Sequence, residues 1–429
     1  MKSRTVKIDY LARVEGEGSL YIKVKKGEII DLRFSIFEAP RFFEAFLRGR
    51  SYQEVPDITA RICGICPVAY VMSSIYAFES LFEIKVEKGI RDLRKLLYFG
   101  DWIQSHALHA FMLHAPDFLG YDDALKMAKD HPEIVRKALR VKRIGNDIMS
   151  FIGGREIHPV SACIGGFYKV PTKAKLESIK GMLEEGLKLA EDLTRWASEF
   201  EYPDFEQDYE FVSLRHPDEY GIIEGRIVSN KGLNIAVNEY DEYFEEYQVP
   251  YSNALQSRIK GRGSYMVGPL ARFNLNFDKL LPRSKSLAEE IGFKPPIKNP
   301  FKSILARCIE IAYGFEESLR IVNEYVEPSK PRVEVKVRAG TGYGCTEAPR
   351  GSLYHRYEVD ERGIVLSAKI VPPTSQNQLR MEDDLRALVP KILDLPKKEF
   401  TWRCEQAIRN YDPCISCATH FLKVEIERL

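Results

Sequence analysis

The sequence predicts an α+β protein, a mainly helical single domain with a central bundle of long helices and small β elements near its N- and C-terminal parts. The first observation is the helical spacing of apolar residues over long stretches of the first half. The second is an alternation of apolar and polar residues near both ends, which is typical of short strands. The third is that the 429 residues contain no internal repeat and no Pro/Gly/Ser-rich linker, which favours one domain.

The N-terminal part, residues 1–60, is expected to be rich in β-structure. Residues 5–37 alternate apolar and polar side chains, and Lys26-Gly27 supplies a turn between two such runs. Because a strand exposes alternate side chains to opposite faces, this pattern predicts a β-hairpin or a short meander.

Residues 61–200 are expected to form the helical core. From about Val68 the apolar residues recur at spacings of three and four, which is the period of an amphipathic helix. Three long helices follow in the prediction: one that stops at Pro116, one over about 122–152 that ends at Gly153-Gly154, and one over 173–200.

Residues 201–330 are expected to be irregular with short strands, followed by a helix over 301–326. The last part, residues 331–420, combines strands and helices in the prediction. The strands are expected in "RVEVKVRAG" and in "HRYEVDERGIVLSAKIVPP", the latter around a turn at Arg362-Gly363, and the helices over about 382–394 and just before Tyr411.

Composition excludes some classes of partner. Lys+Arg number 63 and Asp+Glu 62, so the charge balance gives no reason to expect nucleic acid or an anionic membrane as a ligand. The longest uncharged run, Ile62 to Phe78, is shorter than the about 20 apolar residues of a membrane span. No signal peptide is visible, so we expect a cytoplasmic protein, and the Lys, Glu, Arg and Tyr content suits a thermophile.

Two Cys-x-x-Cys pairs are the strongest chemical signal in the chain. Cys63 and Cys66 stand in "RICGICP", and Cys414 and Cys417 stand in "DPCISCATH" almost the whole chain away. Such pairs serve structural zinc, a redox disulfide or a catalytic metal. Zinc ribbons keep their pairs close in sequence, so a site joining both chain ends suits a catalytic metal better, with nickel, iron, copper(I) or zinc as the ions that thiolates favour.

The two motifs resemble the signatures of the large, catalytic subunit of nickel–iron hydrogenases. The resemblance extends through "RVEGEG", "PRFFE", "SHALH", "GGREIHP" and "EAPRG", while residues 200–330 carry little that matches. It implies that Cys63 and Cys414 are terminal nickel ligands and that Cys66 and Cys417 bridge nickel to iron. The cofactor would be a Ni-Fe(CN)2(CO) centre for reversible heterolytic H2 cleavage.

The same resemblance assigns roles around the metals. Glu15 would take the proton from a nickel-bound cysteine, although a lone Glu beside glycines is otherwise a solvated carboxylate. Arg350 would donate hydrogen bonds to one cyanide, with Asp412 as its ion-pair partner. Thr374 would supply a hydroxyl to the other cyanide, and Pro349 would line the same pocket.

A magnesium site and a processed tail are also implied. Glu44, the backbone carbonyl of Ile370 and His420 would hold Mg²⁺, which prefers oxygen-rich shells. Taken alone, His420 would instead suggest a zinc ligand. Residues 421–429 would be removed by a maturation protease once nickel is in place; the alternative is an ordinary terminal strand.

The implied partners follow from the lack of further cysteine clusters in the sequence. Beyond the two pairs the sequence has no Cys cluster for iron–sulfur centres, so these would sit only in an iron–sulfur small subunit of a hetero-oligomer. Diaphorase or flavin subunits would pass electrons on to NAD(P), a deazaflavin or a similar soluble acceptor. The alternatives are the catalytic subunit of a membrane-bound ion-pumping hydrogenase and a non-catalytic structural-metal subunit of a related complex.

Some residues depart from the family pattern or remain outside it. Tyr70 replaces a frequent His, and Ser105 stands where the respiratory branch tends to have an Asp. His106 and His109 are either structural or near the site. The glycines of "GTGYGCTEAPRG" do not fit a dinucleotide-binding loop. The unpaired cysteines are expected to be core thiols: Cys163, Cys308, Cys345 and Cys404.

Overall fold

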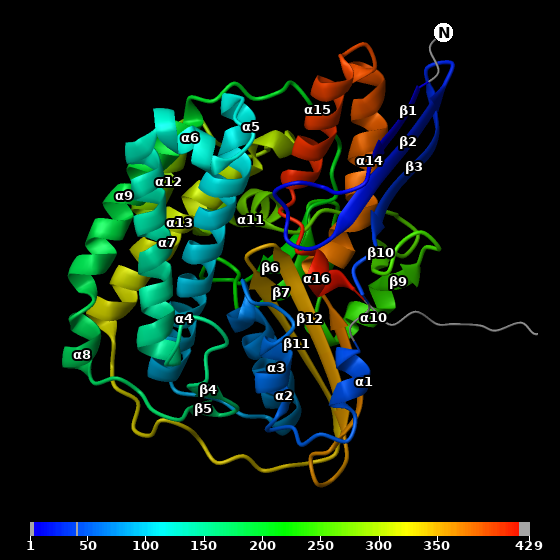
Figure 1. The fold of residues 1–429 in the computed structure, drawn as a ribbon. Coiled ribbons are helices and arrows are strands. Elements are labelled where there is room, and N and C mark those ends of the chain that lie inside the picture. Colours follow the sequence, from blue (N-terminus) through cyan, green and yellow to red (C-terminus); the bar gives the residue numbers. More distant parts are fainter. Residues whose placement is uncertain (1–3, 40–41, 420–429) are drawn as a thin grey trace, which may run out of the picture.

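Four long helices form the bundle of the computed structural model, which describes residues 4–39 and 42–419. They pack side by side on one side of the molecule, and the larger sheets lie on the other side (Figure 1). The four are α4 (Lys88–Ala107), α7 (Pro132–Gly153), α9 (Lys180–Ser198) and α13 (Ser303–Glu324). This arrangement confirms the α+β prediction.

The N-terminal strands form the predicted meander. β1 (Arg4–Ile8), β2 (Gly18–Lys25) and β3 (Glu28–Ile36) are antiparallel and lie in the order β1-β2-β3. Lys26 and Gly27 connect the last two strands with left-handed backbone angles, φ 54° and 88°. The meander packs against α14 (Pro373–Ile392), so the first strands contact a helix from the far end of the chain (Figure 1).

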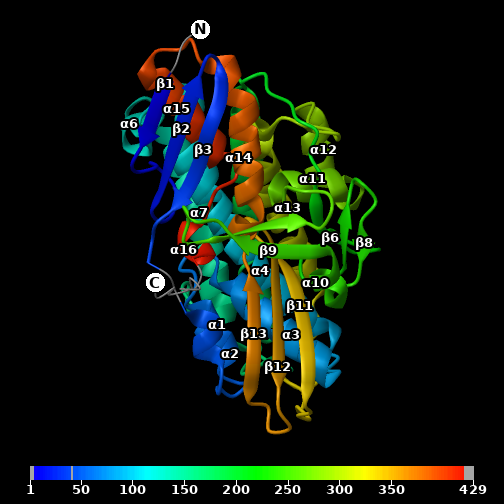
Figure 2. The same ribbon diagram turned by 90° about the vertical axis from the view of Figure 1, so that its right-hand side faces the viewer.

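A second antiparallel sheet supports the helix that follows the first cysteine pair. β11 (Gly340–Ala348), β12 (Gly351–Val359) and β13 (Val365–Val371) lie in that order, and α3 (Pro67–Phe82) packs on β11 and β12 (Figure 2). A Cβ on Gly342 would lie 2.1 Å from the Ala77 oxygen, and one on Gly344 would lie 2.2 Å from the Ser73 oxygen. The two glycines therefore permit helix and strand backbones to touch.

The prediction of a strand in "RVEVKVRAG" is wrong. Residues 333–338 form no strand, and Arg332 makes only an isolated bridge with Gly166. The segment runs over the surface, so its alternation has no neighbouring strand edge to pair with. The segment that pairs with β12 on this side is instead β11, which contains the glycines of "GTGYGCTEAPRG". Because this segment is a strand, it does not form a nucleotide-binding loop.

Helix boundaries differ from the prediction at prolines. The helix expected to stop at Pro116 continues through a π-helical stretch, η1 (Leu108–His114), into α5 (Ala115–Leu119). Pro116 is the second residue of α5 and directly follows the π-helical stretch. The helix expected over 122–152 is divided at His131-Pro132 into α6 (Ala124–Asp130) and α7.

Further short elements complete the described chain. The helix predicted over 173–200 is divided into α8 and α9, and that over 382–394 begins earlier, at Pro373. Three α-helices in 201–330 were not predicted: α10, α11 and α12. The remaining bounds are α1 (Phe43–Leu47), α2 (Val55–Ala60), β4 (Ala162–Cys163), β5 (Gly166–Phe167), α8 (Lys173–Glu177), β6 (Val212–Arg215), β7 (Arg226–Ser229), β8 (Asn234–Ile235), η2 (Val237–Glu239), α10 (Tyr240–Tyr243), β9 (Phe244–Gln248), β10 (Leu255–Ile259), α11 (Pro269–Asn276), η3 (Phe277–Lys279), α12 (Pro282–Glu290), η4 (Pro300–Lys302), α15 (Lys397–Arg409) and α16 (Ile415–Ala418).

Within the described ranges, none of the helices combines the length and the apolar character needed to cross a bilayer.

The contact between α3 and β11 gives a stability prediction. Gly344→Ala places a methyl group against the Ser73 carbonyl and should destabilise the protein by about 1–3 kcal/mol, which is typical of overpacking. Thermal unfolding measures the change. Gly181→Ala is the control, because a Cβ there meets no atom within 4 Å and the position is helical. Equal melting temperatures for the two variants would contradict the backbone contact.

Candidate metal centre

The two cysteine pairs converge on one point in the interior. The Sγ atoms of Cys63, Cys66, Cys414 and Cys417 all lie within 4.8 Å of one another, and the Cys63 and Cys414 sulfurs are 3.7 Å apart. All four side chains are buried, and none takes part in a disulfide. Across residues 4–39 and 42–419 no other group of three or more His, Cys, Asp or Glu side chains has this compact arrangement.

Helix starts position both pairs. Cys66 is the N-cap of α3 with Pro67 as the first helical residue, and Cys414 is the N-cap of the short α16. The Cys63 sulfur accepts the amide of Cys66 at 3.2 Å. The Cys414 amide donates to Thr374 Oγ1 at 2.9 Å, at the start of α14. Backbone amides at a helix start favour a thiolate over a thiol.

The loop after β1 closes over the second pair. Glu15 forms a parallel bridge with Cys414, and its carbonyl accepts the Ile415 amide at 2.9 Å. Its carboxylate Oε2 accepts the Ser416 amide at 3.0 Å. Arg13, with a left-handed φ of 59°, anchors the loop by an ion pair with Asp117. Glu15 is thereby fixed beside the cysteines from the opposite end of the chain.

Arg350 reaches the cysteines from a buried turn between β11 and β12. Its Nε donates to the Asp412 carbonyl at 2.8 Å, and its Nη2 lies 3.1 Å from Asp412 Oδ1. Burial by itself lowers the pKa of Arg350, but the charges of Asp412 and of Cys414 and Cys66 raise that pKa above its ordinary value. Its Nη1 is buried and has no hydrogen-bond partner among the described residues.

A buried ion network underneath this turn was not predicted from the sequence. Arg272 Nη2 donates to the Pro349 carbonyl at 3.0 Å, and its Nη1 donates to the Ala348 carbonyl at 2.8 Å. Glu310 accepts both Nε and Nη2 of Arg272 at 2.8 and 2.7 Å. The network holds Pro349 and Arg350 in place, and an Arg in the middle of a chain gives no sequence signal of such a role.

Asp101 on α4 is another group that sequence reasoning missed. Its side chain is fully buried, and neither carboxylate oxygen has a hydrogen-bond partner in the described chain. Burial first, then the negative charge of Cys63, raises the pKa of Asp101 well above its usual range. It precedes Ser105 by four residues, so both lie on one helix face; this spacing is the signal that could have identified it.

The residues that depart from the family pattern are also buried. Tyr70 lies in α3 with its hydroxyl unpartnered among the described residues, and its ring is 5.8 Å from that of His355. His109 Nε2 lies 3.9 Å from Asp412 Oδ1, whereas His106 Nε2 lies 2.9 Å from Glu310 Oε2. One histidine is therefore near the cysteines and the other belongs to the ion network. The four unpaired cysteines are buried, as predicted.

Two residues of the expected magnesium site lie next to each other. Glu44 Oε1 accepts the amide of Ile370 at 2.7 Å. Both line a cavity of about 290 Å³ that also borders Cys417 and Thr419. His420, the third expected ligand, and the tail 421–429 lie outside the described residues.

Four buried sulfur donors beside one Arg350 nitrogen, Nη1, that has no hydrogen-bond partner in the described chain fit a soft-metal centre that also carries an anionic ligand. The family model of nickel-dependent hydrogenases matches residues 41–135 and 227–420 of this chain. The chain belongs to this family. The match includes both cysteine pairs and much of the middle segment in which no motif was apparent.

Curated hydrogenase relatives span nearly the whole chain. The sulfhydrogenase 1 alpha subunit of Pyrococcus furiosus is 36% identical over 423 residues, which cover 98% of both chains. The corresponding chain of the vhc F420-non-reducing hydrogenase of Methanococcus voltae is 31% identical, covering 97% of this chain and 95% of its own. Because these hydrogenase relatives match over nearly the full length of both chains, this chain is an oxidoreductase that acts on H2.

Solved hydrogenase structures share the fold. An NAD+-reducing [NiFe]-hydrogenase in the H2-reduced state superposes with a TM-score of 0.88 and 27% identity, covering 97% of this chain and 99% of the other. The [NiFeSe] hydrogenase of Desulfovibrio vulgaris Hildenborough gives a TM-score of 0.79 at 24% identity, which shows the fold alone. The cysteine group therefore fits a Ni-Fe centre rather than a structural zinc clip.

Loss of one sulfur should remove the metal. Cys414→Ala is expected to abolish H2 activity and nickel content, because Cys414 touches sulfurs from both pairs. Nickel per chain is measured by elemental analysis of the purified complex. Cys404→Ala, a buried thiol in α15 away from the group, is the control and should keep its nickel. Full activity in the Cys414 variant would remove the site assignment.

Proposed function

We propose that this chain is the catalytic subunit of a cytosolic hydrogenase complex that splits and forms H2 reversibly at a Ni-Fe(CN)2(CO) centre. The observation that carries the proposal is the convergence of four buried sulfurs around a buried Arg350 nitrogen without a partner in the described chain. When bound, this centre supplies the heterolytic cleavage of H2 and accepts its electrons.

The protein groups around the sulfurs divide into ligands and donors. Cys63 and Cys414 would hold nickel, and Cys66 and Cys417 would hold both nickel and iron. The fit of Arg350 supports this assignment: Nε and Nη2 are committed to Asp412, which leaves Nη1 to donate to a cyanide.

The second donor and the turn beside it fit the same cyanide-binding environment. The Thr374 oxygen accepts the Cys414 amide, so its own hydrogen is available to the other cyanide. The Pro349 carbonyl accepts a hydrogen bond from Arg272, and we propose that the Pro349 ring lines the cyanide pocket.

Glu15 is proposed as the first proton acceptor of the protein. Its carboxylate is fixed by the Ser416 amide between the two cysteines of the second pair. In this place the Glu15 carboxylate would take a proton from a cysteine of the group and return it in the reverse reaction.

A Mg²⁺ ion held by Glu44, the carbonyl of Ile370 and His420 is proposed to fasten the C-terminus. The adjacency of Glu44 and Ile370 around the 290 Å³ cavity supports it. We further propose that a maturation protease removes residues 421–429 after metal insertion.

Electrons are proposed to leave beside the first cysteine pair. Gly64, between Cys63 and Cys66, is exposed although both cysteines are buried, so this turn places the first pair near the surface. Arg61, just before the turn, lines a cleft of about 1210 Å³. An electron acceptor docked over this cleft would have a short path to the sulfurs.

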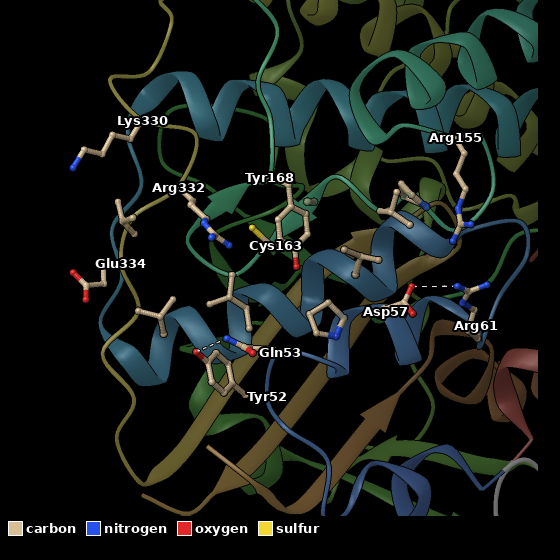
Figure 3. Close-up of a pocket in the computed structure, with 18 residues that line it drawn as sticks. Tyr52, Gln53, Asp57, Arg61, Arg155, Cys163, Tyr168, Lys330, Arg332 and Glu334 are labelled. Carbon is tan, nitrogen blue, oxygen red and sulfur yellow. Dashed lines mark hydrogen bonds and ion pairs between the residues drawn. The ribbon is translucent and has the colours of Figure 1, made fainter. Parts of the chain in front are cut away.

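The cleft has the character of a partner surface (Figure 3). Lys330 and Arg332 lie at one end of it and Arg61 and Arg155 at the other. Two exposed apolar side chains line the cleft with these charges, Val160 and Tyr168. Large exposed apolar groups framed by charges are typical of protein interfaces. We propose that the iron–sulfur small subunit, which would carry all iron–sulfur clusters, docks here.

The names of the relatives support a soluble final acceptor. They include sulfhydrogenases, F420-non-reducing hydrogenases and an NAD+-reducing hydrogenase. We propose diaphorase, flavin or related electron-transfer subunits, and NAD(P), a deazaflavin or a similar acceptor. Among these names, that of the NAD+-reducing hydrogenase supports NAD(P), whereas the F420-non-reducing names give no support to a deazaflavin. The Pyrococcus relative also favours a thermophilic source.

Elemental analysis with infrared spectroscopy of the native complex tests the proposal. About one nickel per chain together with cyanide and carbonyl stretching bands is expected. A complex with zinc in place of nickel, or without these bands, would contradict the Ni-Fe centre.

The role of Glu15 is tested by Glu15→Gln, which removes the acidic proton but keeps the shape of the side chain. We expect exchange of D2 with water to slow by at least about tenfold, because a positioned acid or base contributes more than this to a proton-transfer step. Nickel content should stay unchanged. Exchange at the wild-type rate would reject the relay role.

A further inference from the structure

The segment that leads from α13 to β11 keeps the pattern of a strand although most of it pairs with no other strand. Val333, Val335 and Val337 are half-buried, whereas Glu334 and Lys336 between them are exposed. Val335 and Val337 also pack against the hydrophobic core. Because alternate side chains of an extended chain point to opposite faces, this alternation indicates that residues 333–337 lie on the surface in an extended form.

Only the first part of this segment is paired. The Val333 amide donates to the Gly165 carbonyl at 3.0 Å, and the Phe167 amide donates to the Pro331 carbonyl at 2.8 Å. These two bonds connect the segment to β5. From residue 334 to 338 the described chain supplies no backbone partner. An extended backbone without a neighbour is a template on which another strand can pair.

The open backbone faces the cleft of about 1210 Å³ described above. Along an extended chain, the N–H and C=O groups of every second residue point to the same edge. Pro331 and Val333 bond to β5, so Val335 and Val337 present their backbone groups along that same edge, beyond the end of β5. Val335 lines the cleft, and the segment forms one side of it (Figure 3). A chain lying in the cleft can therefore continue the pairing that β5 begins.

The charges of the cleft favour an acidic occupant. Of the two acidic side chains that line it, Asp57 is already paired with Arg61 at 3.2 Å, and Glu334 is exposed. The other basic side chains that line the cleft are Arg155, Lys330 and Arg332. Complementary charge across an interface selects the partner and sets its register. An incoming chain with acidic side chains matches this excess of positive charge.

We propose that an extended, acidic segment of the iron–sulfur small subunit adds to this chain as a strand, pairing with the edge of Val335 and Val337. The inference rests on the proposed docking of that subunit over the cleft and specifies how the subunit is recognised. Residues 333–338 become a strand in the assembled complex, which accounts for their alternating sequence. In strand addition the backbone hydrogen bonds supply affinity, and the side chains on either side supply specificity.

Hydrogen exchange of the complete chain, alone and in the native complex, tests the pairing. An amide that enters a ladder exchanges more slowly than one that is bonded to water. We expect the amides of Val335 and Val337 to exchange about tenfold more slowly, or slower still, in the complex. The amides of Glu334 and Lys336 face the other edge and should change less.

Two proline substitutions separate backbone pairing from general contact. Val335→Pro removes an amide of the proposed edge, and Lys336→Pro is the matched control because its amide points to the opposite edge. Val335→Ala keeps the amide and measures the share of the side chain. The probe is the small subunit purified from the native complex. We expect Val335→Pro to weaken its binding about fivefold to tenfold, the cost of one lost hydrogen bond, with smaller effects of the other two variants.

The outcomes distinguish this inference from the docking proposal. Protection around Arg61 and Arg155 with unchanged exchange over 334–338 would mean that the small subunit covers the cleft without strand addition, so the inference alone fails. An assembled complex that protects neither region would overturn the docking site as well, while the nickel assignment is tested separately. Equal weakening by Val335→Pro and Lys336→Pro, or by Val335→Pro and Val335→Ala, would also overturn the strand addition.

Discussion

The fold depends on bringing sulfur atoms from both chain ends into one buried point. Each cysteine pair is attached to a rigid element: α3 lies with its backbone against β11, and the segment before α16 is bonded to α14 through Thr374. The loop that carries Glu15 then ties the N-terminal meander to the same segment. A four-sulfur group can form only when these long-range contacts are made together, so the metal site and the tertiary fold are one constraint.

The negative charges of several buried thiolates require positive charge nearby. Arg350 supplies it and is itself held by Asp412, while Arg272 supports the turn beneath. Burial alone would raise the pKa of Glu310, yet the Arg272 guanidinium lowers that pKa to about 2, so the pair is charged throughout the neutral range. Buried charges of this kind are stable only when completely paired. The unsatisfied Nη1 of Arg350 is therefore notable, since it points to a ligand outside the protein chain.

The proposed routes for protons and electrons leave the centre through different elements. Glu15 is bonded to the segment of the second cysteine pair, whereas Gly64 and the cleft around Arg61 adjoin the first pair. Proton transfer needs polar groups within hydrogen-bond distance, and electron transfer needs only short spacing to a docked partner. Separate exits allow a partner protein to cover one face without blocking the other.

The sequence by itself determined the α+β class, the N-terminal meander and the two cysteine pairs, because these carry local patterns or motif spacing, whereas the candidates Glu15, Arg350 and Asp412 came from the resemblance to the hydrogenase family. It misplaced the strand before β12, since alternation in 332–340 says nothing about whether a neighbouring edge exists. Arg272, Glu310 and Ser416 became visible only in the tertiary structure. Their roles come from burial and from contacts between distant segments, which no local pattern encodes.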